Sequence, residues 1–289
     1  RDLHKITKNK IMSKYQYLHS KILPLINFNF NNTDIARELI PDGDYTEIEN
    51  LRKYVAKIRT QDLQNLEPYT QGNKNNILII GDLHAPFNLP DYLEFCLEQQ
   101  KKFKCGTVIF IGDVIDNHYS SYHESDPDGM SAGDELDVAI NELQKYYRVF
   151  PKAFVIIGNH DRLVYRKAFT GGVSKRWIKE YKEVLKVPNW DFVESLDLFD
   201  VNINHGEGGT ARSKMKKELQ SQIQGHLHSE LYIDYIVGKN FRIFGMQVGS
   251  GIDNKSYAMA YGKHFKKPAI GCGVLLNKGT LPVVIPMQL

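Results

Sequence analysis

Short apolar runs that end in a glycine and a polar residue recur through the middle of the chain. Each run has the length of one buried strand, and segments with helical character separate the runs. The runs are Ile77–Ile80 before Gly81-Asp82, Thr107–Ile111 before Gly112-Asp113, and Ala153–Ile157 before Gly158-Asn159, with helical segments expected at Leu89–Lys102 and Asp134–Tyr147. Strands that alternate with helices predict an α/β fold whose functional residues gather at the carboxyl ends of the strands.

Beyond Trp190 the expected strands follow one another more closely. They are Phe192–Glu194, Asp200–Asn204, Leu231–Val237, Phe241–Val248, Gly273–Leu276 and Leu281–Ile285. Closely spaced strands favour antiparallel pairing, because short connections are enough to join them. We therefore expect a second sheet with antiparallel pairs, packed on the first, in an α/β fold of two sheets.

The first 70 residues have a helical character and form a separate predicted domain. Asn31 to Asp34 is rich in residues that cap helices, and Tyr45–Arg59 has the spacing of an amphipathic helix. The stretch from Thr33 to Arg59 resembles a helix-turn-helix. We expect a small helical domain at residues 1–70 and a second, catalytic domain at residues 76–289.

A helix-turn-helix places basic side chains of its second helix against phosphates. The basic side chains available for this role are Arg52, Lys53, Lys57 and Arg59. Glu47 and Glu49 count against it, since they stand early in the helix, where base contacts are usually made. The element is predicted to bind nucleic acid (DNA-binding), and the alternative is a helical cap that packs on the catalytic domain or on a partner.

The composition excludes several classes of protein. Of the 289 residues, 42% are hydrophobic and 25% are charged, which does not fit disordered, collagen-like or coiled-coil chains. The longest apolar runs are too short to cross a bilayer, and no secretory signal is visible. The three cysteines show no metal-ligand spacing. These observations predict a cytoplasmic protein with no membrane partner.

Five polar clusters follow predicted strands, and together they supply the ligand types of a metal site. They are Gly81-Asp82-Leu83-His84, Gly112-Asp113, Gly158-Asn159-His160-Asp161, Asn204-His205-Gly206 and Gly225-His226-Leu227-His228. Each cluster alone is typical of an ordinary loop or turn. At one edge of a sheet, however, their carboxylate, imidazole and amide groups suit divalent transition metals. The glycines allow sharp turns and bring the backbone near the site.

This ordered set of motifs (D-x-H, G-D, G-N-H-D, H and G-H-x-H) resembles the calcineurin-like metallophosphoesterase superfamily over about residues 76–289. The resemblance implies a two-sheet α/β sandwich with two metal ions roughly 4 Å apart. It implies these ligands: Asp82, His84 and His228 for one ion, Asn159, His205 and His226 for the other, and Asp113 as the bridge. The expected ions are manganese, with iron, zinc or nickel as alternatives.

The same resemblance implies that His160 is not a ligand but protonates the leaving oxygen or stabilises charge on the phosphate. Asp161 is expected to orient His160, since a carboxylate often orients a catalytic imidazole. Two cations that share one water lower its pKa, and the resulting bridging hydroxide is expected to attack phosphorus. His160 and Asp161 are thus the predicted catalytic residues.

Three further residues near these motifs are candidate substrate contacts. His118 and His123 belong to a polar, aromatic loop after Asp113, and Arg162 has a side chain that grips phosphates in a bidentate manner. The alternatives are a solvent-facing loop for the histidines and a surface salt bridge for Arg162. Asp116, in the same loop, is expected to orient a ligand or the loop itself.

The chain is therefore predicted to be a metal-dependent phosphodiesterase or nuclease that acts on a nucleic acid or a nucleotide. The grounds for this substrate are the helix-turn-helix-like element and a basic stretch after His205. In overall style the chain resembles phage- or prophage-encoded members, which points to a bacterial or phage-infected cell. One alternative is a phosphatase for proteins or small nucleotides, and another is a non-catalytic scaffold. The intact ligand set argues against the scaffold.

Overall fold

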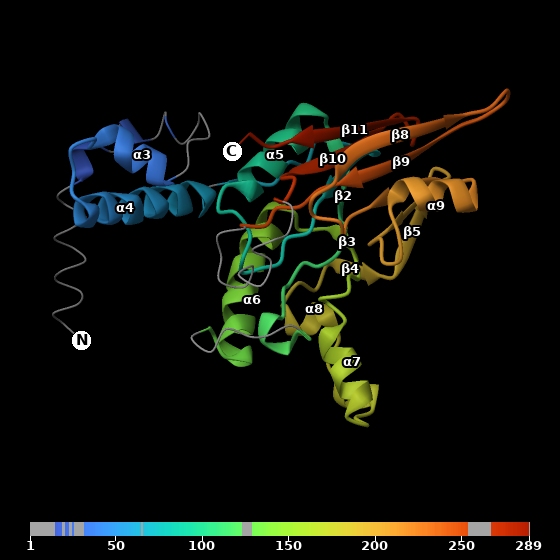
Figure 1. Ribbon diagram of the computed structural model, residues 1–289, viewed down its shortest axis with the longest axis horizontal. Helices are drawn as coiled ribbons and strands as arrows, with labels where there is room; N and C mark the ends of the chain where they lie inside the picture. The colour runs from blue at the N-terminus through green and yellow to red at the C-terminus, as the bar shows by residue number, and fades with distance from the viewer. Residues whose placement is uncertain are drawn as a thin grey trace. The chain divides into compact units, whose positions relative to one another are not determined.

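The computed structural model describes residues 15–18, 21–22, 25, 32–64, 66–122, 129–253 and 267–288, and it divides into two compact units (Figure 1). The first unit comprises residues 1–66 with the last two residues, and the second comprises residues 67–287. Each unit has its own buried apolar core. Among the described residues, no helix is long and apolar enough to cross a membrane.

The first unit is built from helices, as its sequence pattern predicts. They are η1 (Gln16–Leu18), α3 (Asn32–Leu39) and α4 (Tyr45–Gln64). The Asp44 carboxylate accepts a hydrogen bond from the backbone N–H of Glu47 at 2.8 Å, which caps the start of α4. Ile35 of α3 packs in a common core with Leu51 and Val55 of α4, and all three side chains are fully buried. This shared core holds the two helices together.

Six strands form the first sheet of the second unit, in the order β11-β10-β1-β2-β3-β4. Their bounds are β1 (Asn73–Ile80), β2 (Cys105–Phe110), β3 (Ala153–Ile156), β4 (Trp190–Val193), β10 (Gly271–Leu276) and β11 (Leu281–Pro286). Strands β1 to β4 are parallel, as the alternation with helices predicts. β10 pairs antiparallel with β1, with Leu275 opposite Ile77. The carboxyl ends of four strands therefore meet at one edge.

Five strands form the second sheet, in the order β5-β6-β7-β9-β8. Their bounds are β5 (Ser195–Leu198), β6 (Val201–Asn204), β7 (Ser221–Gln224), β8 (Leu231–Val237) and β9 (Arg242–Val248). The outer pairs are antiparallel, but β6, β7 and β9 run parallel. β6 and β7 can pair in parallel because the connection between them is long enough to contain a helix, α9 (Ala211–Glu218).

The prediction that all the late strands belong to the second sheet is wrong for three of them. β4, β10 and β11 join the first sheet instead, on its two sides. The spacing of strands along the sequence reports the length of their connections. It does not indicate which sheet edge a strand joins, because that depends on which edges are open and on which position buries the strand in the folded chain.

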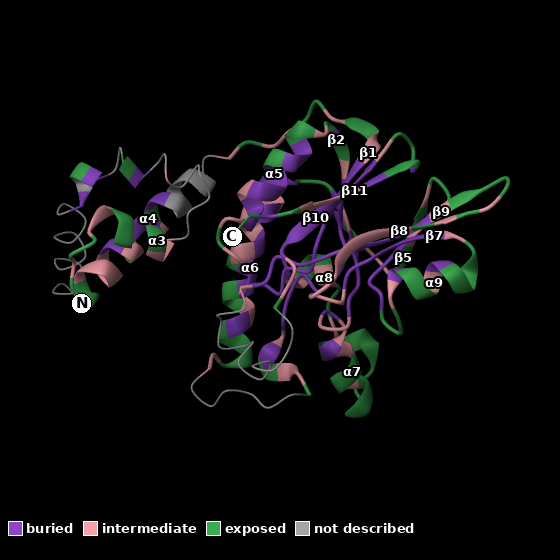
Figure 2. Ribbon diagram, turned by 45° about the horizontal axis from the view of Figure 1, so that its top comes forward, coloured by how far each residue is buried: buried purple, intermediate pink, exposed green. Residues whose placement is uncertain are grey.

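The two sheets face each other across one apolar core, which appears as buried strands in Figure 2. Ile77 and Ile79 of β1 point into this core, whereas Leu78 and Ile80 alternate to the opposite face and are also fully buried. A strand that is buried on both faces explains why its sequence is a continuous apolar run.

The helices of this unit pack on the outer faces of the sandwich or lie in the connections between its strands. Their bounds are α5 (Tyr92–Lys102), α6 (Ala132–Val149), α7 (Leu163–Thr170), α8 (Tyr181–Val184), η2 (His118–Ser120) and η3 (Lys175–Trp177), besides α9. The Tyr92 hydroxyl of α5 donates to the Gly271 carbonyl at 2.6 Å, and the ring of Tyr146 of α6 lies 6.1 Å from that of Phe110. Both helices therefore pack on the first sheet, and α9 buries Met215 against the second.

Candidate metal centre

The seven predicted metal ligands all lie beyond the carboxyl ends of parallel strands. In the first sheet, β1, β2 and β3 lead to Asp82, His84, Asp113 and Asn159; in the second, β6 and β7 lead to His205, His226 and His228. The strands end at a common side of the sandwich, so residues far apart in the sequence meet there. The backbone N–H of His226, for example, donates to a carboxylate oxygen of Asp82 at 2.8 Å, across 144 positions.

Four of these side chains form one group: Asp82, His84, Asp113 and His228, whose ligand atoms lie within 4.8 Å of one another. The Nε2 atom of His228 lies 3.2 Å from Oδ2 of Asp82 and 3.1 Å from Nε2 of His84. The same nitrogen of His84 lies 3.6 Å from Oδ2 of Asp113. Imidazole nitrogens and carboxylate oxygens thus face one another, as they do around a divalent ion.

A second group consists of Asp113, His205 and His226, again with ligand atoms within 4.8 Å of one another. The Nε2 atom of His205 lies 3.1 Å from Oδ2 of Asp113 and 3.0 Å from Oδ1 of Asn159. The rings of His205 and His226 have centroids 5.1 Å apart. Asp113 belongs to both groups, which is the position that a bridging carboxylate needs.

Some buried acceptor atoms of this centre have no hydrogen-bond donor. Such atoms show whether the centre fits metal ions, because a cation can take the place of the missing donor. Oδ1 of Asp82 and Oδ2 of Asp113 are buried and accept no hydrogen bond from the described residues. Nδ1 of His205 lies 3.0 Å from the carbonyl oxygen of Ile111, so in the neutral ring the proton sits on Nδ1 and Nε2 is a bare acceptor. Buried acceptors that face each other need a cation between them. The residues therefore fit a metal centre.

The pKa values of the metal-free centre also reflect the lack of positive charge beside its buried carboxylates. Burial opposes the charged ring of His205, but Asp113 outweighs it and raises the pKa of His205 to about 10. Burial likewise opposes the charged form of Asp113, but the neighbouring imidazoles, His205 first, hold its pKa well below the usual range. Burial lowers the pKa of His84 and of His226. Without metal, a proton on His205 supplies the missing positive charge.

Two motif glycines are required because the ligands approach their backbone very closely. A Cβ atom at Gly225 would lie 2.3 Å from Oδ1 of Asp82, and one at Gly158 would lie 2.1 Å from Oδ1 of Asp113. No side chain fits at such distances, since real Cβ atoms do not come within 3.0 Å of other atoms. The prediction that glycines bring the backbone near the site thus has a steric basis at these two positions.

Asp116 orients His84 from behind. Its Oδ1 atom lies 2.5 Å from Nδ1 of His84, and both side chains are buried. A carboxylate bound to Nδ1 leaves Nε2 of the ring for the metal, as in carboxylate–histidine–metal arrangements. The expectation that Asp116 orients a ligand agrees with this contact.

His160 lies beside the first group of ligands, with its ring centroid 4.5 Å from that of His84. Its Nδ1 atom lies 2.6 Å from the carbonyl oxygen of Asp116, which leaves Nε2 for another contact. Burial disfavours the charged ring, but Asp113 and Asp116 together outweigh it and raise the pKa of His160.

The prediction that Asp161 orients His160 is wrong. The Asp161 carboxylate accepts hydrogen bonds from the backbone N–H groups of Gly158 at 2.8 Å, Val114 at 3.1 Å and Ile115 at 3.4 Å. Asp161 therefore ties the loops after β2 and β3 together, and the Asp116 carbonyl orients the His160 ring instead. Burial, with the charge of Asp113, raises the pKa of Asp161 to about 7. Asp161 is adjacent to His160 in the sequence, but its carboxylate points toward buried backbone N–H groups, which require an acceptor.

The three predicted substrate contacts have different surroundings. His118 is buried, with 5% of its surface exposed, and its backbone N–H donates to the Glu135 carboxylate at 2.6 Å. His123 lies outside the described residues. The Arg162 guanidinium pairs with the carboxylates of Glu194 and Glu207, as the salt-bridge alternative expects. None of these contacts identifies a substrate.

Glu135 is a residue that the sequence pattern does not single out. Its two carboxylate oxygens accept the backbone N–H groups of His118 and Tyr119, so it fixes the loop that follows Asp116. Burial is the largest cause that raises the pKa of Glu135. The only sequence signal was an acidic residue in the first turn of α6, which is common in helices without any such role.

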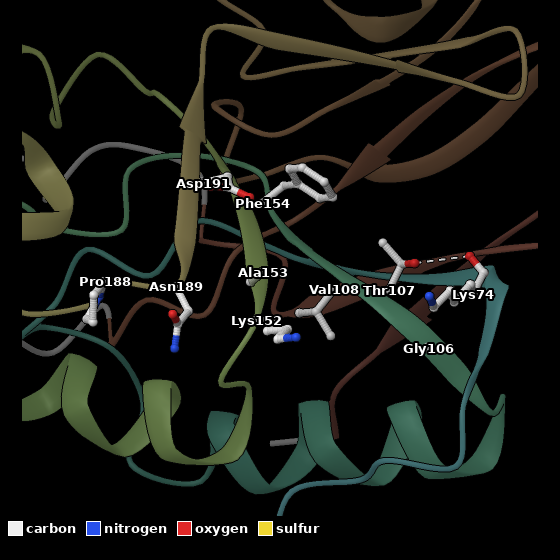
Figure 3. A pocket seen from close by; sticks show the side chains of 10 residues that line it. All are labelled: Lys74, Gly106, Thr107, Val108, Lys152, Ala153, Phe154, Pro188, Asn189 and Asp191. Atoms are coloured by element: carbon white, nitrogen blue, oxygen red, sulfur yellow. Dashed lines mark hydrogen bonds between the residues drawn. The ribbon is translucent and has the colours of Figure 1, made fainter.

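Figure 3 shows a separate hollow at the opposite edge of the first sheet. It is lined by Lys74, Gly106, Thr107, Val108, Lys152, Ala153, Phe154, Pro188, Asn189 and Asp191. These residues stand in β1 or at the amino ends of β2, β3 and β4, whereas the ligands follow the carboxyl ends. The hollow therefore takes no part in the candidate metal centre.

A family model for calcineurin-like phosphoesterases matches residues 76–240, more than half of the chain. The chain belongs to this family. The matched residues contain all five polar clusters, so both observed groups of potential ligands lie within the family region. Membership in this family suggests hydrolase activity that depends on divalent metal ions. The two groups of potential ligands that share Asp113 fit such a metal centre.

Several solved structures match this chain with low identity. A phosphoesterase, YfcE of E. coli, is 17% identical with a TM-score of 0.36, covering 70% of this chain and 88% of that one. The nuclease MPE of Pseudomonas putida is 13% identical with a TM-score of 0.30, covering 73% and 87%. A Vps29 single mutant of Entamoeba histolytica is 11% identical with a TM-score of 0.34, covering 74% and 99%. No curated protein sequence matches.

Proposed function

We propose that the chain is a dinuclear-metal-dependent phosphodiesterase that acts on a nucleic acid or a nucleotide. The observation that carries this proposal is the pair of ligand groups that share the buried carboxylate of Asp113. Two divalent cations held there would neutralise the phosphoryl oxygens and make water a stronger acid. Manganese is the proposed ion, since the mixed oxygen and imidazole set suits it.

The residues of the chain have distinct parts in this proposal. Asp82, His84 and His228 hold one ion, Asn159, His205 and His226 hold the other, and Asp113 contacts both. Nδ1 of His160 donates to the Asp116 carbonyl oxygen, so Nε2 carries a proton only when the ring is charged. The raised pKa of this ring favours the charged form, whose Nε2 proton can pass to the leaving oxygen.

The choice of a nucleic acid or nucleotide is supported by the helices α3 and α4 and by basic residues of α9. Lys216 and Lys217 of α9 are exposed in the stretch that follows the ligand His205. Such a positive surface attracts polyanions. The buried free thiols of Cys96, Cys105 and Cys272 support the further proposal of a reducing, cytoplasmic compartment.

One observation favours the alternative of a phosphatase whose helical domain is a cap. Arg52 donates two hydrogen bonds of 2.8 Å to the Glu49 carboxylate, and Nζ of Lys53 lies 3.4 Å from the same group. Two of the basic side chains that were expected to contact phosphates are thus paired within α4. A nucleic acid would have to compete with Glu49 for them.

The two functions differ in the esters that they cleave. Purified protein loaded with Mn²⁺ would be assayed on bis-p-nitrophenyl phosphate, p-nitrophenyl phosphate, and single- and double-stranded DNA, with Asp113→Asn as the inactive control. We expect cleavage of the diester and of at least one DNA. Cleavage of the monoester alone would refute the phosphodiesterase, and no cleavage by protein with two bound ions would favour the scaffold.

The role of the helical domain needs a separate measurement. The triple variant Arg52→Ala, Lys53→Ala, Lys57→Ala would be compared with Lys101→Ala, Lys102→Ala, Lys104→Ala, which removes the same charge from the end of α5 and the turn after it. If α4 contacts phosphates, only the first variant weakens DNA binding and lowers its salt dependence. Equal effects of the two variants would assign the helices to the cap.

A further inference from the structure

A hollow lined by aromatic and basic side chains lies beside the candidate metal centre, with a volume of about 510 Å³. Its walls come mainly from α7, from the start of α8 and from Tyr122, which follows η2. α7 and α8 lie next to each other in both ribbon views (Figures 1 and 2). The Tyr165 hydroxyl of α7 donates to the Lys179 carbonyl at 2.9 Å, which fixes α7 to the segment before α8.

The aromatic rings of this hollow are arranged at different depths. Tyr165 and Tyr181 are half-buried, with ring centroids 5.0 Å apart, and Phe192 stacks on Tyr181 at 5.2 Å. Tyr122 and Phe169 are 62% and 82% exposed. Large apolar rings that remain this exposed around a hollow favour the binding of a flat ring between them.

Positive charge surrounds the same rings. The Arg166 guanidinium lies 5.2 Å from the centre of the Tyr122 ring, and Nζ of Lys167 lies 5.6 Å from it. Lys175 also lines the hollow. Arg162 contributes little net charge, since Glu194 and Glu207 pair with it. The hollow therefore suits an aromatic group that is attached to an anion.

Two residues connect the wall of this hollow with that of a second hollow nearer the metal centre. Arg162 and Glu194 line it and also line a neighbouring hollow of about 350 Å³, which contains the potential ligand His205. Arg162 follows Asp161 directly, at the start of α7. A phosphate held at the metal centre would thus have an aromatic hollow within reach of its substituent.

We infer that this hollow binds the nucleobase of a nucleotide substrate whose phosphate lies at the metal centre. The inference rests on the proposed phosphodiesterase function and names the part of the substrate that is recognised. Base stacking on aromatic side chains tolerates different bases, because every base has a flat face. The exposed rings of Tyr122 and Phe169 are the positions at which stacking can be removed without disturbing a core.

The test compares two phosphodiesters that differ only in the nucleoside. Thymidine 5′-(4-nitrophenyl phosphate) and methyl 4-nitrophenyl phosphate both release nitrophenol, so one assay follows both. We expect Tyr122→Ala and Phe169→Ala to raise KM for the thymidine ester about tenfold, a typical effect of one lost stacking partner. KM for the methyl ester should remain unchanged. Tyr235→Ala, which removes a partly exposed tyrosine of β8, is the matched control and should affect neither ester.

The other possible results separate the nucleobase hollow from the proposed function. Unchanged kinetics of both variants, or an equal loss on both esters, would overturn the nucleobase hollow while leaving the phosphodiesterase in place. Hydrolysis of neither ester by the wild-type protein would refute the proposed function instead. In that case, calorimetric titration of the Mn²⁺-loaded protein with thymidine monophosphate still tests the hollow. Binding that Tyr122→Ala weakens would support it, and equal binding or none would overturn it.

Discussion

The imidazole Nδ1 of His84 lies 2.5 Å from a carboxylate oxygen of Asp116, in a pair that is buried on all sides. This contact fixes which nitrogen of His84 faces the ligand group, where Nε2 lies 3.1 Å from Nε2 of His228. A residue outside the proposed ligand set thereby determines the orientation of one ligand.

Replacement of Asp116 by Asn should weaken metal binding, because the amide no longer accepts a charged hydrogen bond from His84. Loss of such a supporting carboxylate typically costs about 10- to 100-fold in metal affinity or activity. Titration of the metal-free protein with Mn²⁺ would measure the change. Asp137→Asn, on the exposed face of α6, is the control and should bind Mn²⁺ like the wild type. Equal affinities of the two variants would remove the orienting role.

His160→Ala should keep its metal ions and lose turnover. A side chain that transfers a proton contributes about 10²- to 10⁴-fold to the rate, so kcat should fall in this range. His160→Gln separates proton transfer from hydrogen bonding, since glutamine can donate a hydrogen bond but cannot transfer the proton. Metal content by elemental analysis and kcat on a diester are the measurements. Loss of bound metal in His160→Ala would show that His160 is itself a ligand.

Gly225→Ala should damage the centre while the fold remains. The added methyl group would lie 2.3 Å from Oδ1 of Asp82 and 2.5 Å from a side-chain carbon of Ile111, so the carboxylate must move. We expect weaker Mn²⁺ binding and a loss of about 1–3 kcal/mol in the free energy of unfolding, as for other overpacked sites. Gly133→Ala is the control, since its nearest neighbour would be 4.0 Å away. Unchanged Mn²⁺ affinity in Gly225→Ala would contradict the requirement for a glycine beside the Asp82 carboxylate.

Binding of metal should release protons, and His205 should be their main source. Its raised pKa of about 10 means that the ring is charged at pH 8 in the metal-free protein. Because a metal ligand must be neutral, binding at pH 8 should release about one proton from this residue, and the affinity should rise with pH until about 10. The lowered pKa values of His84 and His226 mean that these rings have no proton to lose at pH 8.

Calorimetric titrations with Mn²⁺ in buffers of different ionisation enthalpy measure the number of protons released. His205→Gln provides the comparison, because glutamine does not titrate. We expect this variant to release fewer protons at pH 8 than the wild type. The same proton release from both proteins would mean that the proton sits elsewhere in the centre.

Much of the fold could be predicted because its pattern is local. The run Ile77–Ile80 is buried on both faces, and a strand in that environment has to be apolar at every position. The sheet assignment of β10 could not be predicted in this way. Its pairing with β1 brings Leu275 opposite Ile77, and that partnership depends on an open edge that only the folded first sheet presents.

The candidate site shows the same division. The partner of His160 could not be predicted from the sequence: Asp161 is its neighbour in the chain, but the Asp161 carboxylate binds backbone N–H groups, and the backbone carbonyl of Asp116 binds the His160 ring. The aromatic hollow had no sequence signal either, because Tyr122, Tyr165 and Tyr181 come from three separate segments.

The sequence by itself determined the chemistry of this protein: which groups can bind metal, their order along the chain, and the strand-glycine-polar pattern that carries them. Those properties are local, since a ligand type and a turn are encoded in a few adjacent residues. Only the tertiary structure decided the partners, such as Asp116 for His84 across 32 positions and Gly225 against Asp82. Partner choice depends on distances between segments that are remote in sequence, and packing of the two sheets sets those distances.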